Sequence, residues 1–239
     1  MRILLAGDSW GVKPNLGRTL FPKRNVDKIS LSSSYKGLED HMANDGHSVL
    51  NVSVSGLSNL QIIEKIKLAN PKNNFDYIFF IQTDPLRDEI HCKFNLGFSE
   101  HLNKKWFETY QDLLDIRKHH LDRAYKKLSS LGETIHVVGG CSKVDKTLIN
   151  SYNNLVCVIE SIPELLVKDY VMPDIWGMNL WQQKIDDRWD LDVLDKLLEQ
   201  LKMTEWLHDN SPYFYIDPMH PDSEGYKKVY ECIKEKIGL

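Results

Sequence analysis

Short apolar runs that alternate with helical patterns constrain the fold of this 239-residue chain more than any other feature. Each run is rich in β-branched or aromatic residues, is bounded by Gly, Pro or polar residues, and is too short for a buried helix, so each predicts a strand. The clearest run, Phe75–Ile81, is apolar on both faces near its end, as expected for a central strand of a parallel sheet. The predicted strands are Ile3–Ala6, His47–Val52, Phe75–Ile81, Thr134–Gly140 and Leu155–Ile159.

The segments between these runs carry apolar residues at helical spacing, together with residues that begin or end helices. Strands that alternate with helices predict an α/β fold, in which helices cover both faces of a parallel sheet. The predicted helices are one capped by Ser34 and ended by Gly46, one with Leu60, Ile63, Ile66 and Leu68 on its apolar face and Pro71 at its end, one over 105–131, one over 191–207, and a last one capped by Asp222 or Ser223.

The length fits a single domain over residues 1–239, with insertions near 11–34, 85–104 and 160–190. The last insertion lacks sustained periodicity and is rich in Pro and Trp, so we expect irregular structure there, with a lid as one option.

Composition excludes several classes of protein. The net charge of −4 gives no basic footprint for nucleic acid or an anionic membrane. No run approaches the ~20 apolar residues of a membrane span, and no signal peptide is recognisable, so we expect a cytoplasmic protein. The cysteines lie far apart without a CxxC pair, and the histidines lack ligand spacing, so we expect free thiols and no metal. These cysteines are Cys92, Cys141, Cys157 and Cys232.

Polar residues follow the first three predicted strands, and in a parallel sheet all three strand ends lie at one edge, where open α/β sheets bind ligands. Ser9 follows the first strand, Gly56 the second and Thr83 the third. We interpret Ser9 as a nucleophile; a serine that merely caps a helix is the alternative.

A base and an orienting acid come from the loop before the last helix. His220 can take the proton of Ser9, and Asp217, three residues earlier, can hold the other ring nitrogen. The backbone N–H groups of Ser9 and Gly56 can then face a developing oxyanion, and a glycine at position 56 leaves the approach clear of a side chain.

These residues resemble the motif blocks of the SGNH (GDSL-like) hydrolase superfamily. Gly7-Asp8-Ser9 matches the first block, Asn51 with Gly56 the second, and Asp217-Pro-Met-His220-Pro221 the last, in the right order along the whole chain. The resemblance implies a three-layer α/β/α fold with a flavodoxin-like sheet.

The third block departs from the family pattern Gly-x-Asn-Asp. The aligned residues are Ile81-Gln82-Thr83-Asp84, so only the Asp is kept. Thr83 replaces the Asn that supplies a side-chain donor to the oxyanion, and its hydroxyl or the amide of Gln82 is the candidate substitute.

Neighbouring residues have two interpretations each. Asp8 and Asp84 are expected to hold the loop architecture, with an acid–base pair as the alternative. Trp10 is expected at the mouth of the site, where it would contact substrate. Arg87 and Asp88 are expected to form a solvated surface pair, with an Arg87 that binds an anionic substrate group as the alternative.

The resemblance implies a serine esterase or deacylase that hydrolyses a carboxylic ester, with a small-molecule, carbohydrate or lipid ester as substrate and no cofactor. The alternative is a catalytically weak or inactive protein of the same fold that binds a sugar or a partner, which the altered third block motivates.

Overall fold

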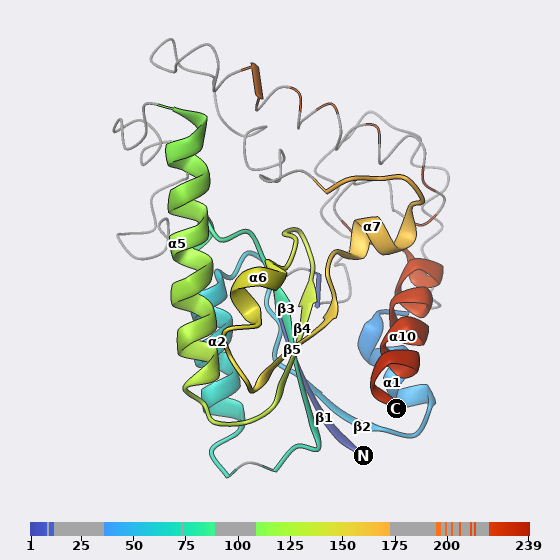
Figure 1. Cartoon of the computed structure of the whole chain (residues 1–239). Coiled ribbons are helices and arrows are strands. Elements are labelled where there is room, and N and C mark those ends of the chain that lie inside the picture. The colour runs from blue at the N-terminus through green and yellow to red at the C-terminus, as the bar shows by residue number, and fades with distance from the viewer. Residues whose placement is uncertain are drawn as a thin grey trace.

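A parallel sheet of five strands lies at the centre of the computed structural model (Figure 1). The structure describes residues 1–8, 10–11, 36–72, 74–88, 109–172 and 220–239, with isolated positions 195, 196, 199, 202, 206, 211 and 213. All five predicted strands form, as β1 (Arg2–Ala6), β2 (Ser48–Asn51), β3 (Tyr77–Gln82), β4 (Ile135–Gly139) and β5 (Leu155–Ile159).

The strand order is β2-β1-β3-β4-β5, and every neighbouring pair is parallel. This is the flavodoxin-like order, in which the direction of winding reverses between β1 and β3. The predicted α/β/α architecture is therefore confirmed, including the flavodoxin-like sheet that the resemblance implied. In such sheets the crevice outside the carboxyl ends of the strands at the reversal is the usual ligand site.

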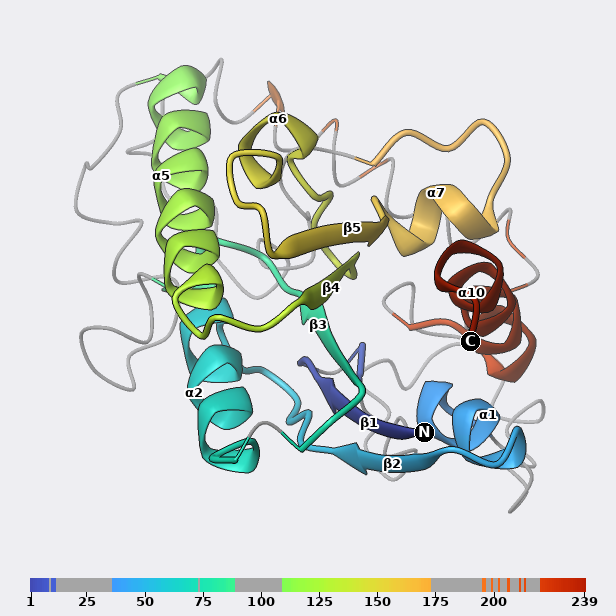
Figure 2. The same cartoon turned by 60° about the horizontal axis from the view of Figure 1, so that its bottom comes forward.

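Helices cover both faces of the sheet, as Figure 2 shows. β3 explains why two layers are needed, since Phe79 and Ile81 pack into one apolar core while Ile78 and Phe80 pack into the other. One face carries α1 (Leu38–Asn44), α7 (Ile162–Leu166) and α10 (Ser223–Ile237), and the other carries α2 (Asn59–Ala69), α5 (Tyr110–Ser129) and α6 (Lys146–Ile149).

Polar caps fix where several helices begin. Ser58 accepts from the N–H of Gln61 at the start of α2, and Thr109 caps α5 in the same way. Asp222 accepts from the N–H of Gly225 (2.7 Å) and caps α10, as predicted. α10 therefore begins three residues after His220 and fixes the chain on its carboxyl side.

Some predicted details were wrong. Gly37, rather than Ser34, is the N-cap of α1. Leu68 was expected on the buried face of its helix but is 74% exposed, because α2 buries Ile62, Ile63 and Ile66 instead. The segment expected to be irregular after residue 160 begins with α7, and α6 was not predicted.

Several expectations fall outside the described residues, among them most of the three insertions and most of the helix over 191–207. Within the described part of the chain, no helix combines the length and the apolar character needed to cross a membrane.

Candidate active site

The loop after β1 is held by the side chain of Asp8, which is fully buried. Its Oδ1 accepts from the N–H of Trp10 (3.0 Å), and its backbone carbonyl accepts from the N–H of Gly11 (3.1 Å). Gly7 is required just before it, because a Cβ there would lie only 2.9 Å from the Cβ of Ile81 on β3. The chain therefore turns sharply after β1, close against β3.

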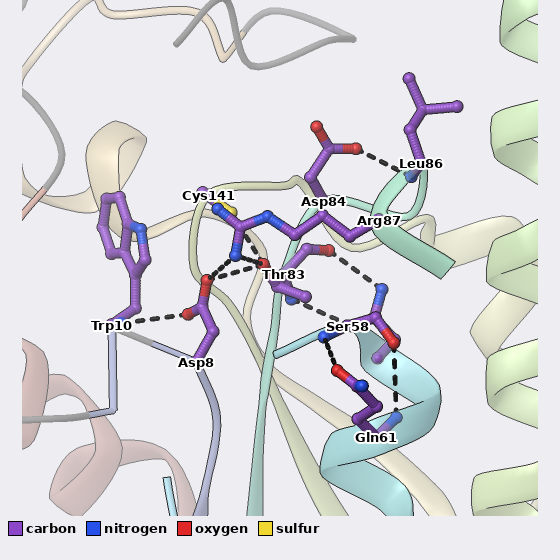
Figure 3. Close-up of polar contacts among 10 residues, drawn as sticks. Asp8, Trp10, Ser58, Gln61, Thr83, Asp84, Leu86, Arg87 and Cys141 are labelled. Carbon is purple, nitrogen blue, oxygen red and sulfur yellow. Dashed lines mark hydrogen bonds and ion pairs between the residues drawn. The ribbon is translucent and has the colours of Figure 1, made fainter. Parts of the chain in front are cut away.

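The other carboxylate oxygen of Asp8 connects β1 to the loop after β3 (Figure 3). Asp8 Oδ2 accepts from Thr83 Oγ1 (2.7 Å) and from Arg87 Nη1 (2.6 Å), and Arg87 Nη1 also donates to Thr83 Oγ1 (2.9 Å). Thr83 is fully buried and the Arg87 side chain is 12% exposed. A buried ion pair thus lies at the reversal between β1 and β3, where ligands bind in this topology.

Charge and burial perturb the groups around this pair. Burial alone would lower the pKa of Arg87, but the acidic groups around it, among them the carboxylates of Asp8 and Asp84, outweigh burial and keep the pKa above its ordinary value. Burial raises the pKa of Cys141, whose Sγ lies 3.3 Å from Thr83 Oγ1, to about 12. Arg87 therefore stays charged, and Cys141 remains a neutral thiol at ordinary pH.

The loop after β3 is held on its other side by α2. The side-chain amide of Asn59 pairs with the backbone of Thr83, accepting from its N–H (2.9 Å) and donating to its carbonyl (3.1 Å). Asp84 is buried and its Oδ1 accepts from the N–H of Leu86 (3.0 Å). The contact with Leu86 gives Asp84 a structural role, because its side chain stabilises the backbone of the loop after β3.

Arg87 and Asp88 do not form the solvated surface pair that the sequence suggested. Arg87 is paired with the buried Asp8, and Asp88 is itself fully buried and accepts from the N–H of Leu60 (2.9 Å). Burial raises the pKa of Asp88 to about 6. The interpretation failed because both side chains turn inward, toward β1 and α2.

Gly56 lies in a turn between β2 and α2, in which the N–H of Leu57 donates to the carbonyl of Val54 (3.3 Å). Its φ is +83°, which side chains rarely adopt, whereas a Cβ there would meet no protein atom within 4 Å. The positive φ is therefore a reason for a glycine here that the backbone itself supplies, and clearance for a substrate stays a prediction.

Gln82 points to the opposite side of β3 from Thr83. Its amide nitrogen donates to Ser142 Oγ (3.1 Å) and to the carbonyl of Lys143 (3.0 Å), and its oxygen accepts from the hydroxyl of Tyr125 (2.5 Å). Tyr125 lies on α5, and Ser142 and Lys143 lie in the loop after β4. This engagement argues against Gln82 as a substitute oxyanion donor.

The rings of His220 and Trp10 lie together, with centroids 6.0 Å apart and planes tilted by 45°. The hydroxyl of Tyr226, on α10, donates to the carbonyl of Trp10 (3.0 Å) and ties the same two segments together. Trp10 is fully buried in the core, so its expected place at the mouth of the site was wrong. Ser9 and Asp217 themselves lie outside the described residues.

Sequence reasoning missed the charged cluster, which consists of Asp8, Thr83, Arg87 and Cys141. The signal that could have revealed it is the position of two charged residues. Asp8 follows β1 and Arg87 follows β3, and these two strands are neighbours in the sheet. Among the residues that the structure describes, no group of His, Cys, Asp or Glu side chains could hold a metal ion.

Comparisons with known proteins give distant structural likenesses only. No family model matches the chain, and no curated protein does. Among solved structures, the chain is similar to the psychrotrophic esterase EstA from Pseudoalteromonas sp., with a TM-score of 0.43, 9% identity and coverage of 99% of this chain and 96% of that one. It is also similar to an acetylxylan esterase from Geobacillus stearothermophilus, with a TM-score of 0.42, 13% identity and coverage of 100% and 94%. At these TM-scores the likeness is too distant to assign a function.

Proposed function

We propose that this protein is a serine esterase or deacylase that hydrolyses a carboxylic ester through Ser9, His220 and Asp217. The observation that carries the proposal is the 6.0 Å contact between the rings of His220 and Trp10, the residue that follows Ser9. The ring of the candidate base thus lies beside the chain neighbour of the candidate nucleophile, although the two are far apart in the sequence, and this supports the pairing. The position outside the carboxyl end of β1, next to the reversal of the sheet, supports the same assignment.

In the proposed mechanism, His220 takes the proton of the Ser9 hydroxyl as its oxygen attacks the ester carbonyl. The backbone N–H groups of Ser9 and Gly56 stabilise the tetrahedral oxyanion. The imidazolium then protonates the leaving alkoxide, and His220 next activates a water that releases the acid from the acyl-enzyme. Asp217 orients the ring and stabilises its charged form.

The resemblance to SGNH hydrolases favours acyl esters or O-acetyl groups, on a small molecule, a carbohydrate or a lipid. No cofactor is required for this chemistry, because the nucleophile, base and oxyanion donors all come from the chain.

A fluorophosphonate probe tests the proposal, since it forms a covalent adduct with an activated serine. We expect an adduct that mass spectrometry locates at Ser9, together with hydrolysis of p-nitrophenyl acetate. Ser9→Ala should lose both, whereas Ser130→Ala, on the exposed end of α5, is the matched control and should keep both. A folded wild-type protein that forms no adduct would overturn the proposal.

A second candidate is a protein of the same fold that binds an ester or sugar without turnover. It is favoured by one observation: the side chains of Thr83 and Gln82, the two predicted side-chain oxyanion donors, are engaged with Asp8 and with Ser142 and Lys143. Acetylated sugars that bind in calorimetry without being hydrolysed, to a protein that fluorophosphonate does not label, would select this candidate.

A further inference from the structure

The hydroxyl of Thr83 has one proton, and its neighbours determine where that proton goes. Arg87 has only donors and an ionised Asp8 has only acceptors. Thr83 Oγ1 therefore accepts from Arg87 Nη1 (2.9 Å) and donates to Asp8 Oδ2 (2.7 Å). With its proton committed to Asp8, the hydroxyl has none to donate to a substrate oxyanion.

Arg87 Nη1 reaches both of these groups and so holds the loops after β1 and β3 together. Asp8 transmits this restraint along the chain, because its Oδ1 accepts from the N–H of Trp10 (3.0 Å). The residue before Ser9 and the residue after it are thus fixed by one carboxylate. Arg87 fixes that carboxylate from the loop after β3.

The charge of Arg87 matters as well as its geometry. A lone carboxylate on the residue before Ser9 would oppose the negative charge that develops on the substrate in the transition state. Arg87 neutralises Asp8 at a distance of 2.6 Å. Buried ion pairs contribute little to stability compared with well-packed apolar residues, so a role in the site explains this pair better than a role in folding.

We propose that Arg87 is a positioning residue that acts through Asp8 and Thr83 on the chain around Ser9, and that Thr83 is not an oxyanion donor. The inference rests on the proposed function for its catalytic consequence. It assigns the altered third block a different task from that of the family's Asn: the block holds the loop of the nucleophile, and the oxyanion depends on backbone N–H groups.

The test compares Arg87→Met, Arg87→Lys and the double variant Asp8→Asn/Arg87→Met in p-nitrophenyl acetate hydrolysis and thermal unfolding. Arg87→Met should lower kcat roughly 100-fold at unchanged KM, because misplacement of a reacting group has effects of this size, and should lower Tm. Arg87→Lys should recover part of kcat, because its ammonium still neutralises Asp8. Lys127→Met, which removes the exposed ion pair with Glu64, is the control and should change neither kcat nor KM.

The double variant separates positioning from stability. It removes both buried charges, so Tm should recover, whereas kcat should regain only the part lost to the unpaired charge of Asp8 and stay at least tenfold below wild type. Recovery of kcat together with Tm would overturn the inference, because the pair would then be merely structural. Thr83→Val should lower kcat less than tenfold; a loss of about 10²–10³-fold, the size expected for an oxyanion donor, would also overturn it.

A readout without activity keeps the two proposals distinguishable. Cys141 lies 3.3 Å from Thr83 and is 1% exposed, so its alkylation by iodoacetamide, measured peptide by peptide, reports whether the cluster is closed. We expect faster alkylation of Cys141 in Arg87→Met, with Cys157 and Cys232 unchanged. If fluorophosphonate fails to label wild-type Ser9, the proposed function fails, and an unchanged Cys141 rate would overturn the positioning role independently.

Discussion

Gln82 and Thr83 are adjacent in the sequence, yet they belong to two different kinds of buried polar network. Gln82 lies in a network built around its neutral side-chain amide, whose nitrogen donates to Ser142 and Lys143 and whose oxygen accepts from Tyr125 on α5. Arg117, also on α5, donates to Ser142 Oγ at its edge (3.0 Å). We call this the neutral network, after the amide at its centre. Thr83 lies in the charged cluster with Asp8 and Arg87. Alternation along the strand sends the two side chains to opposite faces of the sheet.

The difference between the two networks separates structure from chemistry. A neutral amide with all its hydrogen bonds made can be buried without a large penalty, and it fixes α5 to the sheet. A buried ion pair is costly to form, and apolar residues would serve folding at least as well. The charged side of β3 is therefore the one on which we expect substitutions to change activity, and the neutral side the one on which they change stability alone.

The largest effect is expected from His220, which lies on the charged side of β3 with Trp10. His220→Ala should lower kcat for ester hydrolysis by roughly 10⁴-fold or more, because the base that activates Ser9 is lost. Tyr125→Phe removes a hydroxyl from the neutral network and serves as the control with unchanged kcat. Steady-state hydrolysis of p-nitrophenyl acetate measures both, and similar kcat values for the two variants would break the comparison.

Asp88 tests the energetic cost of a buried charge against α2, on the face of the sheet that also carries α5. Its pKa is raised from 3.8 to about 6, so the folded state holds the proton more tightly and the ionised form destabilises the fold. Asp88→Asn should therefore increase the free energy of unfolding by about 3 kcal/mol at pH 7.5. The gain should shrink as pH falls through the window between about 6 and 4, where wild-type Asp88 becomes protonated in the folded state.

Urea unfolding of wild type and Asp88→Asn at pH 7.5 and pH 4 measures this difference directly. Other acidic groups titrate in both proteins, so only the difference between the two is diagnostic. A gain of equal size at both pH values would contradict the assignment of the effect to the charge of Asp88.

Gln82→Leu addresses the neutral network. The substitution leaves the hydroxyl of Tyr125 and the carbonyl of Lys143 without their buried partner, so it should cost about 1–3 kcal/mol in the free energy of unfolding. Catalysis should stay within a factor of two or three of wild type at a temperature where both are folded. A large loss of kcat at unchanged Tm would restore Gln82 as an oxyanion donor.

The smallest effect concerns the turn at Gly56. Gly56→Ala should destabilise the protein by about 1–2 kcal/mol, because an L side chain disfavours its φ of +83°. Gly46→Ala is the matched control, since Gly46 has a φ of +86° and equally open space around it. Both variants should lose similar stability in urea unfolding, but only Gly56→Ala should also lower kcat; an equal kcat for both would remove Gly56 from the site.

Much of the fold follows from local patterns. β5 has the bounds that its apolar run predicted, and Asp222 caps α10 as expected, because strand burial and helix capping depend on residues close together in the sequence. The cap of α1 was predicted at Ser34 but lies at Gly37, because several residues before this helix are able to begin it. The burial of Leu68 was predicted wrongly, because the packing of α2 against the sheet decides which of its apolar residues are covered.

The sequence by itself determined the parallel α/β architecture and which strand ends supply the candidate site, since periodicity dictates the elements and parallel strands share one edge. Tertiary structure alone decided that Arg87 turns inward to Asp8, that Trp10 is buried, and that the hydroxyl of Thr83 faces a carboxylate. The physical reason is that hydrogen-bond partners 75 or more residues apart are brought together by the parallel pairing of β1 with β3, which no local pattern contains.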